Sequence, residues 1–548
     1  MHEKIQFMVH ITASLNNIKN RPGLLAFFSV ATFIASLYLT FEPRFETNDD
    51  VMMSMIAHGY GIAAYGSPQL VYSNVLWGYL IRSIPSINGI LGYSIATILV
   101  LLVIGWVMLF ILLRLGKGYL LSLLLTTLVI AYPALFPQFT MNAGLLTVTA
   151  ILGWQLFAKF GRKRDLGVAC LLAFFGYLIR DSEFFLVMCV ASPLLPWTIL
   201  RKQRQMQIAF LLLGTAIVMS AVFDHWSYQK PEWQQFKEFN TVRIPFTDYG
   251  AGEHIKRHPE ITSRQGFSTN DIDLLSNWFF IDPKIANPIA LSAMLKELGP
   301  LPIQEGSIQS GLKSIELLNT PALVSLLVLA LFLFMLLPRR QTTFVWGLCL
   351  LAFFTMGILG RPGISRVYFP LISLLLIIPI YLGSYTSKIR QYIILLVFIA
   401  WAVNAYLITP LAFWNKQWAQ QVQKDTYNLS KEPTVIWGGG KFGTNIGFPY
   451  VFVFPVLSKT INIPIFELYG LNPFTLAPFS MVNTQQKINH SIIENLQTTT
   501  GIRMIGSPDK IEMLRIYCNQ HLNAQLYDMT ESKSRSFLIH RVRCEKWP

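Results

Sequence analysis

The sequence predicts an all-α polytopic membrane bundle of about eleven transmembrane helices, followed by a smaller C-terminal α/β domain. Two observations carry this prediction. The chain has 53% hydrophobic and only 13% charged residues, whereas an ordinary soluble protein has roughly 25% charged residues. The charges are also confined to short clusters between apolar runs of about 17 to 25 residues, the length that crosses a hydrocarbon core of about 30 Å. So few charges cannot cover a soluble surface, and we interpret the runs as membrane spans.

The first apolar run extends from Gly23 to Phe41 and follows a basic N-terminal segment, residues 1–22. It resembles a signal peptide, but it is long and no small-residue cleavage pattern follows, so we interpret it as a retained span. We expect the further spans near 89–113, 118–137, 140–158, 166–179, 184–200, 206–223, 321–337, 342–360, 367–385 and 391–409.

Basic residues occupy every second short loop between these spans: Arg114, Lys117, Lys159, Arg162, Lys163, Arg164, Arg201, Lys202, Arg204, Arg339, Arg340, Lys388 and Arg390. This alternation predicts that the N-terminus and these loops are cytoplasmic. The opposite side then receives two large outer loops of the 23–409 bundle, 42–88 and 224–320, and a C-terminal domain, 410–548. The net charge of +15 reflects the anchoring residues. The sequence shows no basic stripe with interleaved aromatics, so we do not expect nucleic-acid binding.

The C-terminal segment has a different pattern from the bundle. Apolar runs such as Thr434–Trp437 and Tyr450–Val456 are broken by Gly and Pro, which predicts a small α/β or β-rich domain. Cys518 and Cys544 lie in this polar segment, where a disulfide forms only if the compartment is oxidising. The sequence leaves their pairing open. The other three cysteines lie in apolar runs and are expected to pack as small hydrophobic side chains.

The spans contain almost no ionisable residues in their interiors. An ion-coupled transporter needs such residues near mid-membrane, so we expect the chemistry at the outer face. The first outer loop begins with Thr47 or Asn48 as a helix cap, Asp49 and Asp50 in the first turn, and Met52, Met55 and Ile56 on one face. This pattern predicts a helix lying on the membrane. A second such helix is expected over Val75–Leu80, with Trp77 as an interfacial anchor.

Asp49 and Asp50 are the candidate catalytic residues. A carboxylate beside the membrane suits the removal of a proton from an acceptor hydroxyl during sugar transfer. The alternative is that the two acids only complement the helix dipole. Two adjacent acids exceed what capping requires, which favours the catalytic role.

Three arginines at the outer ends of spans are candidates for binding a phosphate: Arg361, Arg366 and Arg180. Guanidinium groups match phosphate oxygens in pairs, and the low dielectric at the membrane edge strengthens the contact. The alternative is an anchoring role, or for Arg180 a simple pairing with Asp181 or Glu183.

The large loop 224–320 mixes aromatic side chains with amides and charges, which could line a groove for a sugar acceptor or could stabilise a compact loop. The sequence favours neither over the other. The candidates for acceptor or sugar binding are Trp233, Asn240, Arg243, Asp248 and Trp278. His254 and His258 stand four residues apart without a third ligand at a defined spacing, so no metal site is assigned.

The layout resembles the GT-C superfamily of polyprenyl-phosphate-dependent glycosyltransferases, which includes protein mannosyltransferases, aminoarabinose lipid A transferases and serotype-converting glucosyltransferases. The resemblance covers roughly residues 20–410. It is carried by the Asn48-Asp49-Asp50 motif after the first span, by the surface helices that follow and by the outer-face arginines.

The resemblance implies that Asp49 or Asp50 is the catalytic acid of the first loop, and that Arg366 or Arg361 contacts the carrier phosphate. It also implies a polyprenyl-phosphate sugar as donor, a glycolipid or polysaccharide acceptor and a bacterial inner membrane. Many members carry a second acid in a later short outer loop, where this chain offers only Gln138. Asp181, Glu183 and Asp224 are the candidates to substitute for it, and the use of a divalent cation stays open.

Two other classes share part of this pattern. An O-antigen polymerase or ligase also combines many spans with large outer loops, but it needs no acidic pair in the first loop. A lipid-linked glycan flippase needs a polar central cavity, which the almost uncharged spans do not favour. Among these three classes, the sequence therefore favours a sugar transferase. It leaves the sugar, the acceptor, the anomeric outcome and the oligomeric state undetermined.

Overall fold

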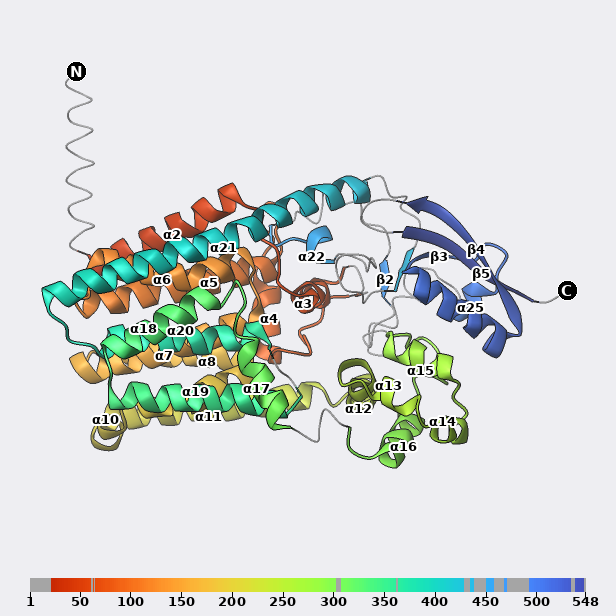
Figure 1. The fold of residues 1–548 in the computed structure, drawn as a ribbon, viewed down its shortest axis with the longest axis horizontal. Helices are drawn as coiled ribbons and strands as arrows, with labels where there is room; N and C mark the ends of the chain where they lie inside the picture. The colour runs from red at the N-terminus through yellow and green to blue at the C-terminus, as the bar shows by residue number, and fades with distance from the viewer. Residues whose placement is uncertain are drawn as a thin grey trace, which may run out of the picture.

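A computed structural model describes residues 21–60, 63, 65–301, 307–360, 363–427, 434–437, 450–457, 468–470, 492–533 and 538–546 of the chain. The predicted cytoplasmic segment lies outside these residues up to position 20. The described chain is mostly helical and ends in a small sheet, which confirms this part of the predicted fold class. Figure 1 shows the helical bundle on one side and the sheet on the other.

The bundle is built from helices that follow most of the predicted spans: α2 (Pro22–Thr40), α5 (Gly92–Arg114), α6 (Tyr119–Leu135), α7 (Phe139–Phe160), α8 (Lys163–Ile179), α11 (Arg204–Ser227), α18 (Val324–Leu336), α19 (Arg340–Ile358), α20 (Ser365–Leu382) and α21 (Ser387–Tyr427). Among the described residues, seven helices are long and apolar enough to cross a membrane, and α6 and α18 are shorter apolar helices. The predicted count of about eleven spans is therefore not confirmed.

The predicted span 184–200 is not one helix. It is divided into α9 (Asp181–Val190), the 3-10 turn η1 (Ser192–Leu194) and α10 (Trp197–Lys202). Pro193 and Pro196 explain the division, because proline removes a backbone donor and clashes with the preceding helical turn. The hydropathy of the segment does not reveal this break, because the apolar run is continuous.

Helix α7 lies at the centre of the bundle and is buried along most of its length. Glycines allow the close approach of its neighbours, because a Cβ at Gly144 would clash with Pro370 of α20, and one at Gly153 would clash with Ala169 of α8. Small residues at helix contacts are typical of packing between apolar helices. The N-terminus of α7 is capped by Gln138, whose Oε1 accepts from the backbone N–H groups of Thr140 and Met141.

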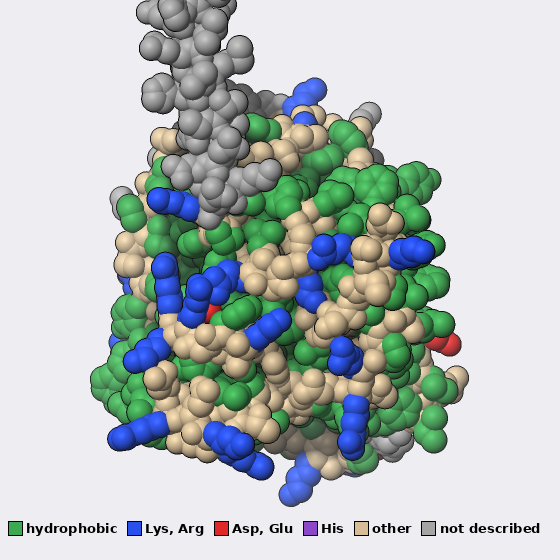
Figure 2. Space-filling model, turned by 90° about the vertical axis from the view of Figure 1, so that its left-hand side faces the viewer, with side chains coloured by type: hydrophobic (Ala, Val, Ile, Leu, Met, Phe, Trp, Pro, Cys, Tyr) green, Lys and Arg blue, Asp and Glu red, His purple; other side chains and the backbone are tan. Residues whose placement is uncertain are grey.

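Basic loop residues gather at one end of the bundle, which we call the basic end. Lys117 donates from Nζ to the Gly383 carbonyl at 2.6 Å, and Arg390 donates to the Gly116 carbonyl at 2.7 Å. Lys159 and Arg339 lie close enough to repel Lys117 electrostatically. Figure 2 shows Lys and Arg side chains spread over this face with few acids among them. Sequence-distant basic loops therefore share one end, as the alternation predicts.

The first loop forms the two predicted helices, α3 (Asn48–His58) and α4 (Val75–Ser83), at the opposite end of the bundle. We call this end the mouth. Two details of the prediction are wrong. Helix α3 is not laid on a surface, because most of its side chains are buried. Trp77 is 6% exposed and packs against Phe175, so it belongs to the core and is not an interfacial anchor.

The large loop forms five helices that follow α11: α12 (Pro231–Asp248), α13 (Ala251–Ile255), α14 (Pro259–Arg264), α15 (Thr269–Ser276) and α16 (Pro288–Leu298). They are followed by α17 (Ile308–Glu316), which packs on the bundle against α19. Helix α21 continues beyond the predicted end of the last span, through Pro410 to Tyr427. Figure 1 shows it extending from the bundle toward the sheet.

The C-terminal segment forms a mixed sheet of β1 (Thr434–Ile436), β2 (Leu468–Gly470), β3 (Ile502–Ile505), β4 (Ala524–Lys533) and β5 (Leu538–Lys546), with helices α24 (Ile492–Leu496) and α25 (Pro508–Leu522). The strand order is β2-β1-β3-β5-β4. Strand β1 is parallel to β2 and β3, and the pairs β3–β5 and β4–β5 are antiparallel. The predicted α/β character is confirmed, although the Tyr450–Val453 stretch is a helical turn, α22.

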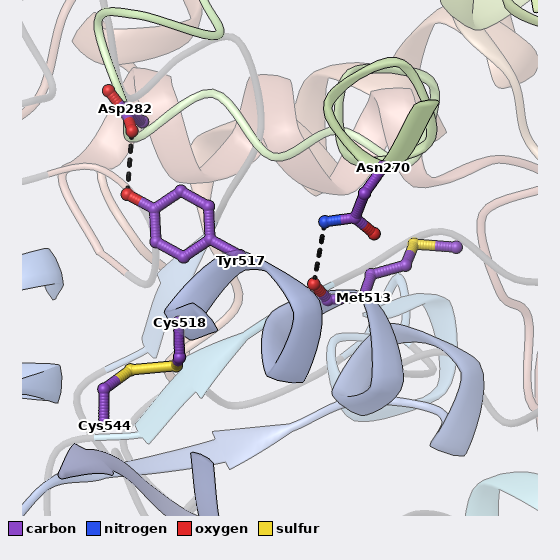
Figure 3. Close-up of a disulfide and its surroundings, with 6 residues drawn as sticks. All are labelled: Asn270, Asp282, Met513, Tyr517, Cys518 and Cys544. Carbon is purple, nitrogen blue, oxygen red and sulfur yellow. Dashed lines mark hydrogen bonds between the residues drawn. A yellow bond between two sulfur atoms is a disulfide. The ribbon is translucent and has the colours of Figure 1, made fainter. Parts of the chain in front are cut away.

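The large-loop helices α12–α16 and the C-terminal segment share one hydrophobic core, and we call this unit the joint domain. Phe279 of the loop packs between Trp437 and Tyr517, with ring centroids 5.3 and 5.1 Å away. Cys518 and Cys544 form a disulfide that joins α25 to β5. Figure 3 shows this bond beside the hydrogen bond from Tyr517 to Asp282 of the loop.

Candidate functional site

Charged groups from four separate segments meet at the mouth. They come from α3, from the turn between α8 and α9, from the start of α20 and from α12, and a tyrosine of the first loop lies among them. Electrostatic interactions link all of them. We call this set the mouth cluster, and its members are Asp49, Tyr72, Arg180, Arg243, Asp248 and Arg366.

Asp49 is paired with Arg366 across the mouth. The distance from Asp49 Oδ2 to Arg366 Nη1 is 3.6 Å, and both side chains are about one third exposed, at 31% and 34%. Burial raises the pKa of Asp49 above its usual range, and the charges of Arg366 and Arg180 oppose that rise. Asp49 is therefore a reachable carboxylate with cations beside it.

Asp50 is fully buried and serves the structure of the first loop. Its Oδ1 accepts hydrogen bonds from the Tyr93 hydroxyl at 2.9 Å and from the Phe139 backbone N–H at 3.1 Å. Thr47 donates to its Oδ2 at 3.4 Å. Burial raises the pKa of Asp50 well above its usual range. These contacts attach α3 to α5 and α7, and they leave no face of Asp50 for a ligand.

Arg180 is placed by aromatic groups and forms no ion pair with a described carboxylate. Its Nη1 donates to the Tyr72 carbonyl at 3.1 Å. Its guanidinium carbon lies 5.9 Å from the Tyr72 ring and 5.7 Å from the Phe139 ring. Those two rings are stacked at 6.0 Å. Burial lowers the pKa of Arg180, so the site holds a desolvated cation, which favours binding of an anion.

Arg243 is held in one orientation by its own helix and by Trp278. Its Nε and Nη2 donate to Asn240 Oδ1 at 3.0 and 2.7 Å, and Asp248 Oδ1 lies 3.7 Å from its Nη1. The guanidinium lies 4.5 Å from the Trp278 ring centroid. Four of the five predicted acceptor-binding residues are thus in contact. Their arrangement suits an arginine fixed in place as well as a sugar groove.

The remaining predicted residues fall elsewhere. Trp233 is 2% exposed and packs against Tyr228 and Phe236, so it is a core residue. Arg361 lies outside the described residues. Asp224 accepts from the Val75 backbone N–H at 2.7 Å and so caps α4.

Of the other acids considered as substitutes, Glu183 is 2% exposed and one of its oxygens has no partner among the described residues. Asp181 accepts from the backbone N–H of Ser182. Neither acid shares the Asp49–Arg366 ion pair among the described residues. In the part of the chain that the structure describes, no three His, Cys, Asp or Glu side chains gather closely enough to hold a metal ion.

Two residues of the site carry no signal that sequence reasoning used. Glu46 lies beside the cluster, where Tyr132 and Ser365 donate to its Oε1 at 3.3 and 3.4 Å, and its other oxygen has no partner in the described chain. Its place one turn before Asp49 in an acidic run could have suggested it. Tyr72 is one of three tyrosines between α3 and α4, with Tyr60 and Tyr65, and nothing in the sequence distinguishes it from the other two.

No family model matches the chain, and no curated protein matches it.

Proposed function

We propose that this protein is a membrane glycosyltransferase that moves a sugar from a polyprenyl-phosphate carrier to a lipid or glycan acceptor. The observation that carries the proposal is the Asp49–Arg366 pair with Arg180 beside it. Arg180 itself forms no ion pair among the described residues. A carboxylate next to one partly exposed and one desolvated guanidinium at the end of an apolar bundle fits a reaction that needs a base and a site for a leaving phosphate.

In this mechanism Asp49 is the base and Asp50 is structural. Asp49 takes the proton of the acceptor hydroxyl while the acceptor oxygen forms a bond to the anomeric carbon of the sugar. The bond from that carbon to the phosphate oxygen breaks, and its electron pair leaves with the phosphate as polyprenyl phosphate. Arg366 and Arg180 stabilise the added negative charge. The pKa of Asp49 is raised and therefore lies closer to neutral pH. A general base is most effective when its pKa is near the working pH.

The proposal also places the mouth and the joint domain on the non-cytoplasmic side of a bacterial inner membrane. The gathering of basic loops at the other end supports this orientation. The disulfide between Cys518 and Cys544 supports it independently, because disulfides persist in oxidising compartments. A lipid-linked donor is the form in which activated sugar reaches that side without a nucleotide.

The first test is transfer of radiolabelled sugar from polyprenyl-phosphate donors to membrane glycolipid by the purified protein. Asp49→Asn should lower the rate by about 10²–10⁴-fold, the range for loss of a general base, while the donor still binds. Arg366→Lys should weaken donor binding, because lysine does not reproduce the paired contacts of arginine.

Glu512→Gln is the matched control, because Glu512 is an exposed acid that pairs with Arg515 in the joint domain, away from the mouth. It should leave transfer unchanged. Asp50→Ala should lower the thermal stability of the protein, since it removes the acceptor of two buried hydrogen bonds. Full activity of Asp49→Asn would contradict the assignment of the base. A wild-type protein that transfers sugar from no such donor would favour the polymerase, ligase or flippase alternatives.

A further inference from the structure

Tyr72 lies where the two halves of the mouth cluster meet. Its hydroxyl interacts electrostatically with Asp49 and Arg180 on the bundle side and with Arg243 and Asp248 on the loop side. The hydroxyl makes no hydrogen bond with a described residue, and the side chain is only half-buried. Burial raises the pKa of Tyr72 to about 12, so it remains a hydrogen-bond donor at neutral pH.

The backbone at Tyr72 is held in an unusual conformation. Val71 has a φ of 71°, which is a genuine outlier for a β-branched residue. The Tyr72 N–H donates to the Leu70 carbonyl at 2.8 Å and closes a three-residue turn around Val71, a strained type of turn when φ is positive.

Contacts from distant parts of the chain keep this turn in place. The Val71 N–H donates to the Tyr228 hydroxyl at 3.0 Å. The Ser73 hydroxyl donates to the Ile179 carbonyl at 2.7 Å, and Arg180 donates to the carbonyl of Tyr72 itself. Strain of this kind persists only where the surroundings determine it, and it concentrates at functional sites. Several contacts from distant parts of the chain therefore fix the position of Tyr72.

We propose that Tyr72 is a further substrate-binding residue, whose hydroxyl donates a hydrogen bond to a phosphate oxygen of the lipid-linked substrate between Arg180 and Arg243. The inference rests on the proposed function for the identity of the substrate. Its chemistry follows from the site: a donor hydroxyl and two oriented guanidiniums suit a phosphate anion better than a cation or a neutral sugar. Arg243 is 4% exposed and its guanidinium donates to Asn240 and Thr247, so the joint domain would act on the phosphate through the positive charge of this arginine.

The test measures binding of tritiated undecaprenyl phosphate to the full-length protein in lipid nanodiscs. Tyr72→Phe removes only the hydroxyl and should raise the Kd by about 10–150-fold, the range for loss of a hydrogen bond to a charged group. Undecaprenol, which lacks the phosphate, should bind wild type and variant equally. Tyr79→Phe is the matched control, because Tyr79 is an exposed tyrosine of α4 outside the cluster, and its Kd should match wild type.

Inorganic phosphate at millimolar concentration is the second probe. Competition that is weaker in Tyr72→Phe than in wild type means that the subsite also accepts free phosphate, and an absence of competition in wild type assigns it to the lipid headgroup alone. An unchanged Kd for undecaprenyl phosphate in Tyr72→Phe overturns the inference, whether or not wild type transfers sugar. A raised Kd in a protein that transfers no sugar sustains the inference and removes the proposed function.

Discussion

Val71 and Trp278 are two of the four described non-glycine residues with positive φ, and both adjoin the mouth cluster. Val71 precedes Tyr72, and Trp278 lies under Arg243. The other two, Asn88 and Asn523, are asparagines, for which this conformation is common. At residue scale, the strained positions therefore mark the side chains that the cluster orients.

The Val71→Gly variant tests whether the strained backbone at Val71 serves substrate binding or the stability of the protein. Glycine adopts a positive φ freely, so relief of about 1–3 kcal/mol of strain offsets the added flexibility and the lost side chain. We expect the unfolding temperature to change little, while Tyr72 loses its backbone constraint and undecaprenyl phosphate binds several-fold more weakly. The measurement is the Kd in nanodiscs together with a thermal melt.

Asn88→Gly is the control for this change, because Asn88 has a φ of 51° in the same first loop and is not a member of the cluster. It should leave the Kd unaltered. Equal binding by wild type and Val71→Gly would mean that the turn only shapes the loop.

Sequence patterns suggested Asp49, Arg366 and Arg180 for one site because acids and arginines beside apolar spans are rare enough to be informative. The same patterns could not separate Asp49 from Asp50, since the difference depends on Tyr93 and on the N-terminus of α7. Two tryptophan assignments failed for a related reason. Trp77 and Trp233 are core residues, and whether a tryptophan lies at an interface or in a core is decided by tertiary packing.

At the scale of elements, the helices were more predictable than their ends. Apolar length identifies a span, but it does not show where the helix stops. Helix α21 continues past the apolar run and past Pro410, because the polar residues that follow still permit helix. Its continuation contacts the first loop, where Arg44 donates to Asn415 Oδ1 at 2.7 Å. Such a contact joins residues far apart in sequence and leaves no local signal.

The packing of α15 against α25 should depend on pH. His521 Nε2 and Asp271 Oδ1 lie 2.7 Å apart. The hydrogen bond to Asp271 raises the pKa of His521. Although burial opposes ionisation of Asp271, the same bond and a backbone contact hold its pKa below the usual range.

Because the pKa of His521 is raised by folding, its charged form stabilises the fold fully at pH values below the unfolded histidine pKa of about 6.5. Because the pKa of Asp271 is lowered by folding, its charged form stabilises the fold at pH values above the unfolded aspartate pKa of about 3.9. The contact should therefore contribute most between these values and weaken as the pH rises through the folded pKa of His521. We expect a loss of about 1–2 kcal/mol by pH 9, seen as faster amide exchange of residues 508–522 after correction for intrinsic rates. His521→Gln should abolish the pH dependence, and His225→Gln should preserve it. A pH-independent rate in wild type would contradict the pairing.

For the whole molecule, the disulfide should matter for the joint domain and not for the bundle. Cys518→Ser with Cys544→Ser removes a link between α25 and β5, at a cost of about 2–4 kcal/mol. Limited proteolysis of the variant should release fragments from residues 492–546 while the bundle helices stay intact. Cys189→Ser, at an exposed free cysteine, should behave like wild type. Equal resistance of the double variant would show that the shared core suffices without the link.

The shared core of the joint domain also sets an order of events during synthesis. Phe279 and its neighbours in the large loop are made long before Trp437 and Tyr517, which complete their packing. At translation rates of ~5–20 residues per second, the loop helices wait roughly 10–50 s for the last strands. During that interval their apolar faces have no partner from the chain itself. A truncated chain that ends after α21 should therefore leave the loop helices without their core, even though every helix of the bundle has already been made.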